Sequence, residues 1–444
     1  MTDMKNKLLD VLEKRTLGIH CGIPSFCSAN KIVIEAIMDQ AKRFDDTVLI
    51  EATSNQVNQF GGYMDMTSVD FREYVYKIAD QIGFDKDKII LGGDHLGPLP
   101  WCNLPAEEAM EHAKKLVYDC VMAGYTKVHL DTSMKLGDDP VDEMLPNEVI
   151  AERGAILYKE CDKAYNELLK ENPDAVQPVY IIGSEVPIPG GSQEEEDNLK
   201  VTNPRDFEST IMAYRRMFNK LGLKDAWNHI IGIVVQPGVE FGNTDIHTYN
   251  RLDAIKLCNR LKKYPDIVFE GHSTDYQPPV KLREMVEDGI AIIKVGPALT
   301  NAVREAIFAL SMIEKELIDD ESKRANFIEV LEEVMMAEPS NWIKHYHGTD
   351  KQQAIARKYS FSDRSRYYFT HEKVLAAQEK LFENLLDIDI PLPVLHQYMP
   401  MQYSKVRDGK LTCTPRELAK DAVVCVVEDY NYAVKCNYMA NPMM

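Results

Sequence analysis

The chain lacks the apolar segments that would tie it to a membrane. No run of about 18 apolar residues occurs anywhere, and the N-terminus, MTDMKNKLLDVLEKR, has no apolar core of the secretory type. Its nine cysteines include no C-x-x-C pair. Such spacing is typical of reduced thiols, so neither a disulfide framework nor a thiolate zinc site is expected. We therefore expect a cytoplasmic protein.

Positive charge is also scarce. Lys and Arg number 51 against 70 Asp and Glu, which leaves a formal net charge of −19. Nucleic acids and anionic membranes reward clustered basic residues, so neither is expected as a partner. Hydrophobic residues make up 45% of the chain and charged residues 27%, a balance that predicts a folded chain throughout.

Short apolar runs recur along the first 300 residues, and a longer amphipathic helical pattern follows each of them. The eight runs are LGIHCGIPS from Leu17, TVLIEATSN from Thr47, KIILGGDHL from Lys88, KVHLDTS from Lys127, PVYIIGSEVP from Pro178, GIVVQPGVE from Gly232, IVFEGHSTD from Ile267 and AIIKVGPAL from Ala291.

This alternation is typical of a parallel sheet covered by helices. Eight units favour an α/β fold of the (β/α)₈ TIM-barrel type over a doubly wound sheet, which would more often show five or six strands and a glycine-rich phosphate loop. Neither a G-x-G-x-x-G nor a Walker motif is present. Two smaller α/β domains are the alternative. We predict a barrel over residues 1–315 and a mostly helical extension over 316–444, packed on the barrel.

Polar residues stand where each predicted strand ends, which in such a barrel is the mouth that holds the active site. They are His20, Glu51, Asp94 with His95, His129 with Asp131, Glu185, Gln236 with Glu240, Glu270 with His272, and Lys294. So many acids and imidazoles beside apolar strands are costly unless they pair with one another or bind a ligand.

The mixture of His, Glu and Asp without thiolates suits a divalent ion such as Zn²⁺ or Mn²⁺. Structural roles compete with this interpretation. His20 and His129 could be satisfied core histidines, and Glu51 and Asp131 could be ion-paired supports. For Asp94, His95, Glu185 and His272 the neighbouring glycines and prolines favour a loop opening over a packed layer.

A family resemblance rests on LGGDHLGP, VHLDTS, SEVPIPGG, VVQPGVEFG, FEGHSTD and IIKVGPALTNAVREAI, together with YSFSDRSRYY and PLPVLHQYMP nearer the C-terminus. With these motifs the chain resembles the non-catalytic subunit family of class II tagatose-1,6-bisphosphate aldolase, once labelled tagatose-6-phosphate kinase. Some members of that family assist a separate aldolase subunit. Others are similar to metal-dependent enzymes that invert C4 of ketohexoses or their 6-phosphates.

The family is similar in turn to the catalytic class II aldolases, which implies roles for several residues. Asp94 matches their proton-transfer aspartate, His95 a metal ligand and Glu185 an acidic residue after the fifth strand, whereas Lys294 replaces an asparagine. Their two other metal-binding histidines fall on Glu240 and Glu270, with His272 nearby. The metal ligands predicted here are His95, Glu240 and His272, with Glu270 in reserve, and the substrate-binding residues predicted are Ser25, His129, Asp131, Gln236 and Lys294.

Two hypotheses on function follow. The first is a metal-dependent ketohexose or ketohexose 6-phosphate 4-epimerase with Asp94 and Glu185 as catalytic residues, acting by retro-aldol cleavage or by proton transfer. The second is a subunit that stabilises or activates a class II aldolase. A substrate phosphate is expected at the amides of VGPALTNAV, aided by Lys294 and by Arg364 or Arg366. A kinase is disfavoured because no nucleotide loop is present, and assembly into a homo-oligomer is left open.

Overall fold

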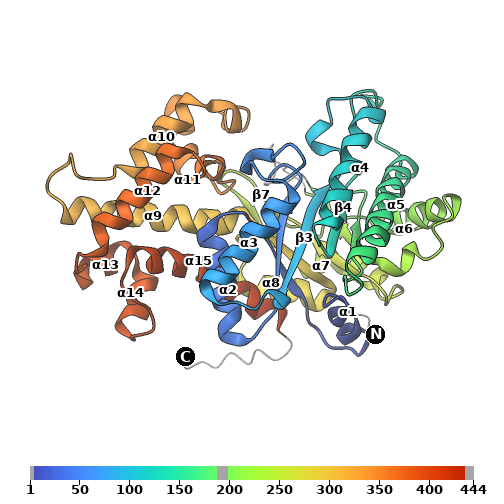
Figure 1. The fold of residues 1–444 in the computed structure, drawn as a ribbon, viewed down its shortest axis with the longest axis horizontal. Helices are drawn as coiled ribbons and strands as arrows, with labels where there is room; N and C mark the ends of the chain where they lie inside the picture. Colours follow the sequence, from blue (N-terminus) through green and yellow to red (C-terminus); the bar gives the residue numbers. More distant parts are fainter. Residues whose placement is uncertain (1–4, 188–198, 436–444) are drawn as a thin grey trace.

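Eight parallel strands close into a barrel in the computed structural model, which describes residues 5–187 and 199–435 (Figure 1). Around the barrel the strands follow the order β1, β2, β3, β4, β5, β6, β9, β10 and back to β1. Their bounds are β1 Ile23–Cys27, β2 Val48–Thr53, β3 Ile89–Leu96, β4 Lys127–Leu130, β5 Val179–Ile182, β6 Ile230–Val235, β9 Val268–Gly271 and β10 Ile290–Val295. The predicted TIM barrel is confirmed.

Helices surround the barrel, and local sequence fixes where several of them begin. Asn30 precedes the helix that follows β1, and its side chain accepts hydrogen bonds from the amides of Ile32 and Val33, whereas Thr67 and Asp70 form a capping box. The helices of this part are α1 Leu9–Thr16, α2 Lys31–Phe44, α3 Ser68–Ile82, α4 Ala106–Met122, α5 Asn147–Glu171, α6 Pro204–Lys220, α7 Arg251–Leu261, α8 Pro279–Asp288 and α9 Pro297–Leu317.

The barrel interior is apolar at its lower end. Leu8 and Leu12, from the N-terminal segment with α1, pack there against a cluster of buried side chains that includes Ile23, Leu49 and Ile90 from the first three strands. This plug closes the end of the barrel at which the strands begin. Ionisable side chains inside the barrel are therefore confined to its upper half and mouth.

Two features differ from the sequence interpretation. The first strand begins at Ile23, six residues after Leu17, which is 77% exposed, so His20 lies before the strand, exposed, with its Nδ1 3.0 Å from the Glu287 carbonyl. The expectation of His20 at the mouth is wrong. A small antiparallel pair, β7 Glu240–Phe241 and β8 Ile246–His247, was not expected after the sixth barrel strand.

The C-terminal extension is helical in its described part and projects from one side of the barrel (Figure 1). Its helices are α10 Phe327–Ala337, α11 Asp350–Tyr359, α12 Glu372–Leu386, α13 Leu392–Tyr398, α14 Pro400–Arg407 and α15 Pro415–Val434. The last of them returns to the barrel and packs against α2, α8 and α9. Residues 436–444 lie outside the described residues, and the domain division at residue 315 stays a prediction.

Ion pairs fix α15 to the barrel wall. Arg416 binds the Glu35 carboxylate at 2.8 Å and Lys420 binds Asp39 at 2.6 Å, and both carboxylates belong to α2. In addition, the Tyr430 hydroxyl donates to the Thr274 carbonyl at 2.8 Å. The final helix thus covers the wall beside the first and last strands and contacts the loop that follows β9.

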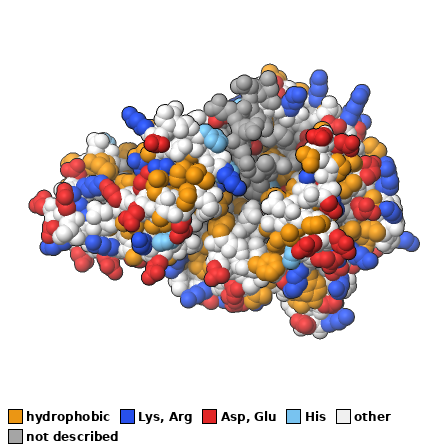
Figure 2. Space-filling model, turned by 90° about the horizontal axis from the view of Figure 1, so that it is seen from above, with side chains coloured by type: hydrophobic (Ala, Val, Ile, Leu, Met, Phe, Trp, Pro, Cys, Tyr) orange, Lys and Arg blue, Asp and Glu red, His pale blue; other side chains and the backbone are white. Residues whose placement is uncertain are grey.

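The surface carries both signs of charge. On the face drawn in Figure 2, basic side chains lie scattered among acidic ones, and the described part of that face has no basic patch of the kind that nucleic acids require. Within the described residues no helix combines the length and apolar character needed to span a bilayer.

Candidate functional site

Asp94 and His95 both face the barrel mouth because the end of β3 is irregular. Neighbouring residues of a regular strand point to opposite faces. Here the register between β3 and β4 shifts between Gly93 and Leu96, and His95 takes a left-handed conformation with φ 47°. Strained backbone of this kind is common where a functional side chain must be aimed. The shift turns an adjacent acid and imidazole into one site.

Glycines make room around this strand end. A Cβ added at Gly92 would lie 2.5 Å from Oε1 of Glu51, and one added at Gly97 would lie 1.7 Å from the Asp131 carbonyl oxygen. Both approaches are closer than van der Waals contact allows. The glycines of GGDHLG therefore let the neighbouring strands bring their own acidic residues up to Asp94 and His95.

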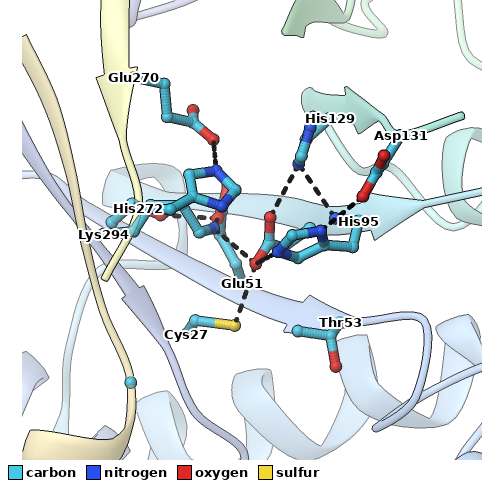
Figure 3. A network of polar contacts seen from close by, with 12 residues as sticks. Cys27, Glu51, Thr53, His95, His129, Asp131, Glu270, His272 and Lys294 are labelled. Atoms are coloured by element: carbon cyan, nitrogen blue, oxygen red, sulfur yellow. Dashed lines mark hydrogen bonds and ion pairs between the residues drawn. The ribbon is translucent and has the colours of Figure 1, made fainter. Parts of the chain in front are cut away.

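A buried network of ion pairs lies below the mouth (Figure 3). Glu51 accepts a hydrogen bond from Ser25 at 2.6 Å and pairs with both Lys127, at 2.8 Å, and Lys294. Lys127 also pairs with Glu270 at 2.8 Å, and Lys294 lies 2.8 Å from Asp94. The network joins strands from opposite sides of the barrel, so it positions the side chains above it.

Three imidazoles stand over this network, and each has one ring nitrogen on a carboxylate (Figure 3). The pairs are His95 Nδ1 with Asp131 Oδ2 at 2.7 Å, His129 Nδ1 with Asp94 Oδ1 at 3.0 Å, and His272 Nε2 with Glu270 Oε1 at 2.9 Å. A carboxylate behind an imidazole fixes the tautomer and leaves the other nitrogen as a ligand, which is the usual arrangement behind metal-binding histidines.

His129 Nδ1 also lies 3.2 Å from the backbone N–H of His95, and one tautomer cannot satisfy both contacts. We assign the proton to Nδ1 because the carboxylate contact is shorter and a buried ionised acid needs a donor. The second nitrogen, Nε2, is buried and has no hydrogen-bond partner among the residues that the structure describes. This ring therefore has an unsatisfied nitrogen.

The rings of His95, His129 and His272 lie close together, with centroids 4.9–5.1 Å apart. Asp94 joins them, because each of the four residues offers one ligand atom and these atoms all lie within 4.8 Å of one another. All four side chains are buried. The structure thus brings together three nitrogen donors and one oxygen donor, a set that suits Zn²⁺ or Mn²⁺.

Electrostatics set the protonation of these groups. Burial alone would raise the pKa of Asp94, but His95 and Lys294 outweigh it and hold that pKa well below its usual range. Burial alone would lower the pKa of His95, whereas its neighbours Asp94 and Asp131 raise it. Burial lowers the pKa of His272 to about 4. Asp94 is therefore an ionised carboxylate and His272 a neutral imidazole near pH 7.

The charges of the buried cluster do not cancel. Glu51, Asp94, Asp131 and Glu270 supply four negative charges, against two positive charges from Lys127 and Lys294. If all three imidazoles are neutral, as metal-binding imidazoles must be, two negative charges remain in a region of low dielectric, where uncompensated charge is costly. A divalent cation would balance them.

Three residues predicted for the site lie elsewhere. Glu185 is exposed and accepts a hydrogen bond from Thr202 at 2.5 Å. The side chain of Gln236 accepts from the amides of Gly238 and Val239, so it closes the turn after β6. Glu240 lies on β7, outside the group of four potential ligands, and accepts from the Phe241 amide at 3.0 Å. None of the three lines the cavity at the mouth.

The cavity at the mouth, of about 370 Å³, has walls from both parts of the chain. Asp94, His95, His272 and Lys294 line it from the barrel. From the extension come Arg366, Tyr367, Phe369, Thr370, Leu375 and Gln378. Of the two arginines predicted to bind phosphate, Arg366 lines the cavity, whereas Arg364 donates to the Asn341 carbonyl at 2.9 Å and does not line it.

The expected phosphate site at the start of α9 is already filled. Asp275 Oδ1 accepts hydrogen bonds from the amides of Gly296, at 3.0 Å, and Ala298, at 2.8 Å. These are the amides that an anion would use at this helix N-terminus. A phosphate at that position would meet a carboxylate, so the structure argues against this part of the sequence interpretation.

Sequence reasoning missed Lys127 altogether. The residue opens β4 and is fully buried between Glu51 and Glu270. One signal in the sequence could have found it. Lys127 begins an apolar strand run that also contains His129 and ends at Asp131, and a lysine is unusual in such a buried strand. Glu270, held in reserve as a ligand, is instead the carboxylate partner of His272.

A (β/α)₈ barrel whose mouth gathers imidazoles, carboxylates and a lysine belongs to the class of TIM-barrel proteins with a polar site at the strand ends. A family model places the chain more closely. The model of D-tagatose-1,6-bisphosphate aldolase subunit GatZ/KbaZ-like proteins matches residues 8–435, and the chain belongs to this family. The resemblance read from the motifs is confirmed.

Solved structures include a close relative. A crystal structure described as that of a "probable tagatose 6 phosphate kinase" from Sinorhizobium meliloti 1021 is 44% identical, covers 93% of this chain and 100% of its own, and superposes with a TM-score of 0.84. The YdjI aldolase of Escherichia coli K12 and the fructose-bisphosphate aldolase of Campylobacter jejuni are 12% and 14% identical, each with a TM-score of 0.41. They cover 82% and 85% of this chain, and 96% and 93% of their own. Likenesses this distant carry no inference about activity.

Proposed function

We propose that the protein is a metal-dependent sugar enzyme that inverts C4 of a ketohexose or ketohexose 6-phosphate of the fructose and tagatose series. The observation that carries the proposal is the gathering of His95, His129 and His272 with Asp94 at the barrel mouth. A barrel wall that needed only stability would be better served by apolar side chains there. The family description, which names tagatose 1,6-bisphosphate, supports the sugar class.

The residues present fit a divalent ion, and we propose His95, His129 and His272 as its protein ligands, with Asp94 beside them. His129 takes the place that the sequence interpretation gave to Glu240. The close approach of the four potential ligand atoms and the carboxylates behind the rings of His95 and His272 support this ligand set. When bound, such an ion would stabilise negative charge that develops on the substrate oxygens.

Asp94 is the proposed base. Its ionised carboxylate takes the proton from the C4 hydroxyl, the C4–O electron pair forms a carbonyl, and the C3–C4 bond breaks with its electrons delocalised toward C2. The aldehyde fragment turns, the bond forms again on the opposite face, and Asp94 returns the proton to the C4 oxygen. Lys294, 2.8 Å from Asp94, keeps the carboxylate ionised and orients it.

The route by carbon deprotonation through Glu185 has less support. That residue is exposed and bonded to Thr202, and it does not line the cavity. Although the residue as a whole is exposed, partial burial of its carboxyl group raises the pKa, which would suit a base, but a base must reach the substrate before its pKa matters. Cleavage and re-formation of the C3–C4 bond is therefore the route that we propose.

A second candidate is a subunit that stabilises or activates a class II tagatose-1,6-bisphosphate aldolase. The observation that favours it is the family description itself, which calls these proteins aldolase subunits. The two candidates differ in what they require at the barrel mouth. An epimerase needs a base there, whereas a purely supporting subunit does not. In either case we propose the cytoplasm as the compartment, on the cysteine pattern of the sequence.

The deciding experiment incubates the pure protein with fructose 6-phosphate and with tagatose 6-phosphate, in Mn²⁺ or Zn²⁺ and in chelator, and analyses the sugars formed. We expect interconversion only with metal, and a loss of at least about 100-fold in Asp94→Asn. An absence of epimerisation with every metal, together with stimulation of a separate aldolase, would overturn the epimerase and support the second candidate.

A further inference from the structure

We propose that Arg366, supplied by the C-terminal extension, binds a phosphate monoester at the end of the substrate remote from the imidazole cluster. The inference rests on the proposed function and deepens it, because it makes the sugar phosphate, and not the free sugar, the substrate. Arg366 lines the cavity at the mouth, as do the barrel residues Asp94, His95 and His272.

The guanidinium of Arg366 is held in one orientation. Its Nη1 donates to the carbonyls of Ser362 and, at 2.8 Å, of Asp363, and its Nη2 donates to the Tyr367 hydroxyl at 3.0 Å. It also lies over the Tyr367 ring, 4.4 Å from the centroid. An arginine fixed in this way has already lost most of its rotamer freedom, so a ligand does not have to order it.

These contacts leave donors unused. A guanidinium carries five N–H groups, and these three hydrogen bonds leave the Nε hydrogen and one Nη2 hydrogen without an acceptor among the described residues. Nε and Nη2 form one edge of the guanidinium, and that edge matches two oxygens of a phosphate or carboxylate. The free edge is the binding group that the inference requires.

Asp275, which lines the same cavity, and Asp363 attract the Arg366 guanidinium at longer range, but neither forms a close ion pair with it. Within residues 5–187 and 199–435, Arg366 forms no ion pair with a carboxylate, although most comparable buried arginines do. The nearest acid in sequence, Asp363, is already engaged: Arg304 binds its Oδ1 at 3.0 Å, and Thr300 donates to its Oδ2 at 2.6 Å. A half-buried cation without a carboxylate partner, in a protein of net charge −19, is a place for an anion.

The competing position for the anion is closed, since the amides at the start of α9 are bonded to Asp275. Arg364 is turned away to the Asn341 carbonyl. Among the groups that the sequence offered for a phosphate, Arg366 is the one that lines the cavity and has no carboxylate at ion-pair distance among the described residues. Because a phosphate carries more charge and more oxygens than a carboxylate, it uses the free edge more fully.

Isothermal titration calorimetry on the full chain, freed of metal by chelator, tests the inference with fructose 6-phosphate, fructose, glucuronate and inorganic phosphate. The variants are Arg366→Gln, Arg366→Lys and Arg407→Gln. Arg407 is the matched control, since it too lies over a tyrosine of the extension, Tyr403, but is exposed and outside the cavity. Thermal melting of each variant checks that it folds.

We expect fructose 6-phosphate to bind wild type and Arg407→Gln alike, and Arg366→Gln about 10- to 100-fold more weakly, with fructose unaffected. Arg366→Lys should fall between, because it keeps the charge and loses the paired donors. Equal affinity of wild type and a folded Arg366→Gln for fructose 6-phosphate would overturn the inference, as would a preference for glucuronate. Anion binding is measured without metal and without turnover. If the epimerase assay fails, the calorimetry therefore still shows whether Arg366 binds the phosphate.

Discussion

The two walls of the cavity are built in different ways. The barrel wall carries Asp94, His95, His272 and Lys294 on strand ends or just after them, where backbone ladders fix each position. The extension wall carries Arg366 and apolar or aromatic side chains such as Tyr367 and Phe369, on short helices and turns. Groups that react need the precision of strands, whereas a group that recognises the end of a ligand can lie on a separate layer.

The two walls of the cavity also differ in how their charged side chains are paired. On the barrel wall every charged group has a partner within the protein, and the surplus of two negative charges belongs to the cluster as a whole. On the extension wall a single cation, Arg366, has no carboxylate partner among the described residues. The barrel wall thus favours a cation and the extension wall an anion, which are the two ends of a metal-assisted sugar phosphate reaction.

The largest effect is expected from removal of an imidazole at the barrel wall. His95→Ala and His272→Ala should each lower metal content from about one ion per chain to near zero and reduce epimerisation at least about 1,000-fold, because each removes a ligand. Metal content is measured by elemental analysis after dialysis. His396→Ala, which removes an exposed imidazole of α13, is the control and should change neither. Unchanged metal content in the first two variants would remove those residues from the site.

Removal of the buried positive charge of Lys127, below the site, should lower the stability of the folded protein. Lys127→Met leaves Glu51 and Glu270 without a shared buried cation, so we expect the free energy of unfolding to fall by about 3–5 kcal/mol. Urea denaturation measures it. Lys256→Met, at an exposed position of α7, should change it by less than about 0.5 kcal/mol. A small effect of both substitutions would show that the network contributes little to stability.

The pH dependence of stability should change when Asp275, which also lines the cavity, loses its charge. Burial raises the pKa of Asp275 to about 6, so its ionised form destabilises the folded protein above that pH. Asp275→Asn keeps an acceptor for the amides of Gly296 and Ala298 without the charge. It should be up to about 3 kcal/mol more stable than wild type at pH 8, and the difference should vanish below about pH 4. Unfolding curves at several pH values measure this, and a difference independent of pH would contradict it.

A smaller effect is expected where the last helix reaches the site. Tyr430→Phe removes the hydroxyl that donates to the Thr274 carbonyl, and Thr274 in turn donates to the Lys294 carbonyl at 2.5 Å. We expect a loss of about 1 kcal/mol in unfolding free energy and little change in metal content. A loss of metal with Tyr430→Phe would mean that α15 positions the site and does more than cover the wall.

Much of the barrel was predictable, because hydrophobic periodicity reports directly on burial. The eight runs gave eight strands, and only the first was placed too early, since the apolar residues Leu17 and Ile19 lie in an exposed turn. Four residues that the strand-end rule assigned to the mouth, Asp94, His95, His272 and Lys294, line the cavity. It was wrong for His20, because a run of apolar letters does not tell where within it the strand begins.

Other parts of the site could not be predicted from one sequence. Glu240 and His129 are both polar residues at or beyond strand ends, and nothing in the local pattern shows that His129 joins the cluster whereas Glu240 lies on a separate small hairpin. The same holds for Lys127, whose partners are 76 and 143 positions away in the chain. Such contacts depend on how strands meet across the barrel axis, and periodicity carries no information about that.

The sequence by itself determined the fold class and the chemical character of the mouth, because burial periodicity and strand-end composition are local properties of the chain. Only the tertiary structure decided which groups act together. The shift in register at β3 and the left-handed backbone of His95 let two adjacent residues face one site, against the alternation of a regular strand. Closure of the barrel then brought His129 and His272 to them, and the folding back of the extension added Arg366. Each is a long-range contact, which the energy of the whole fold selects and no single segment encodes.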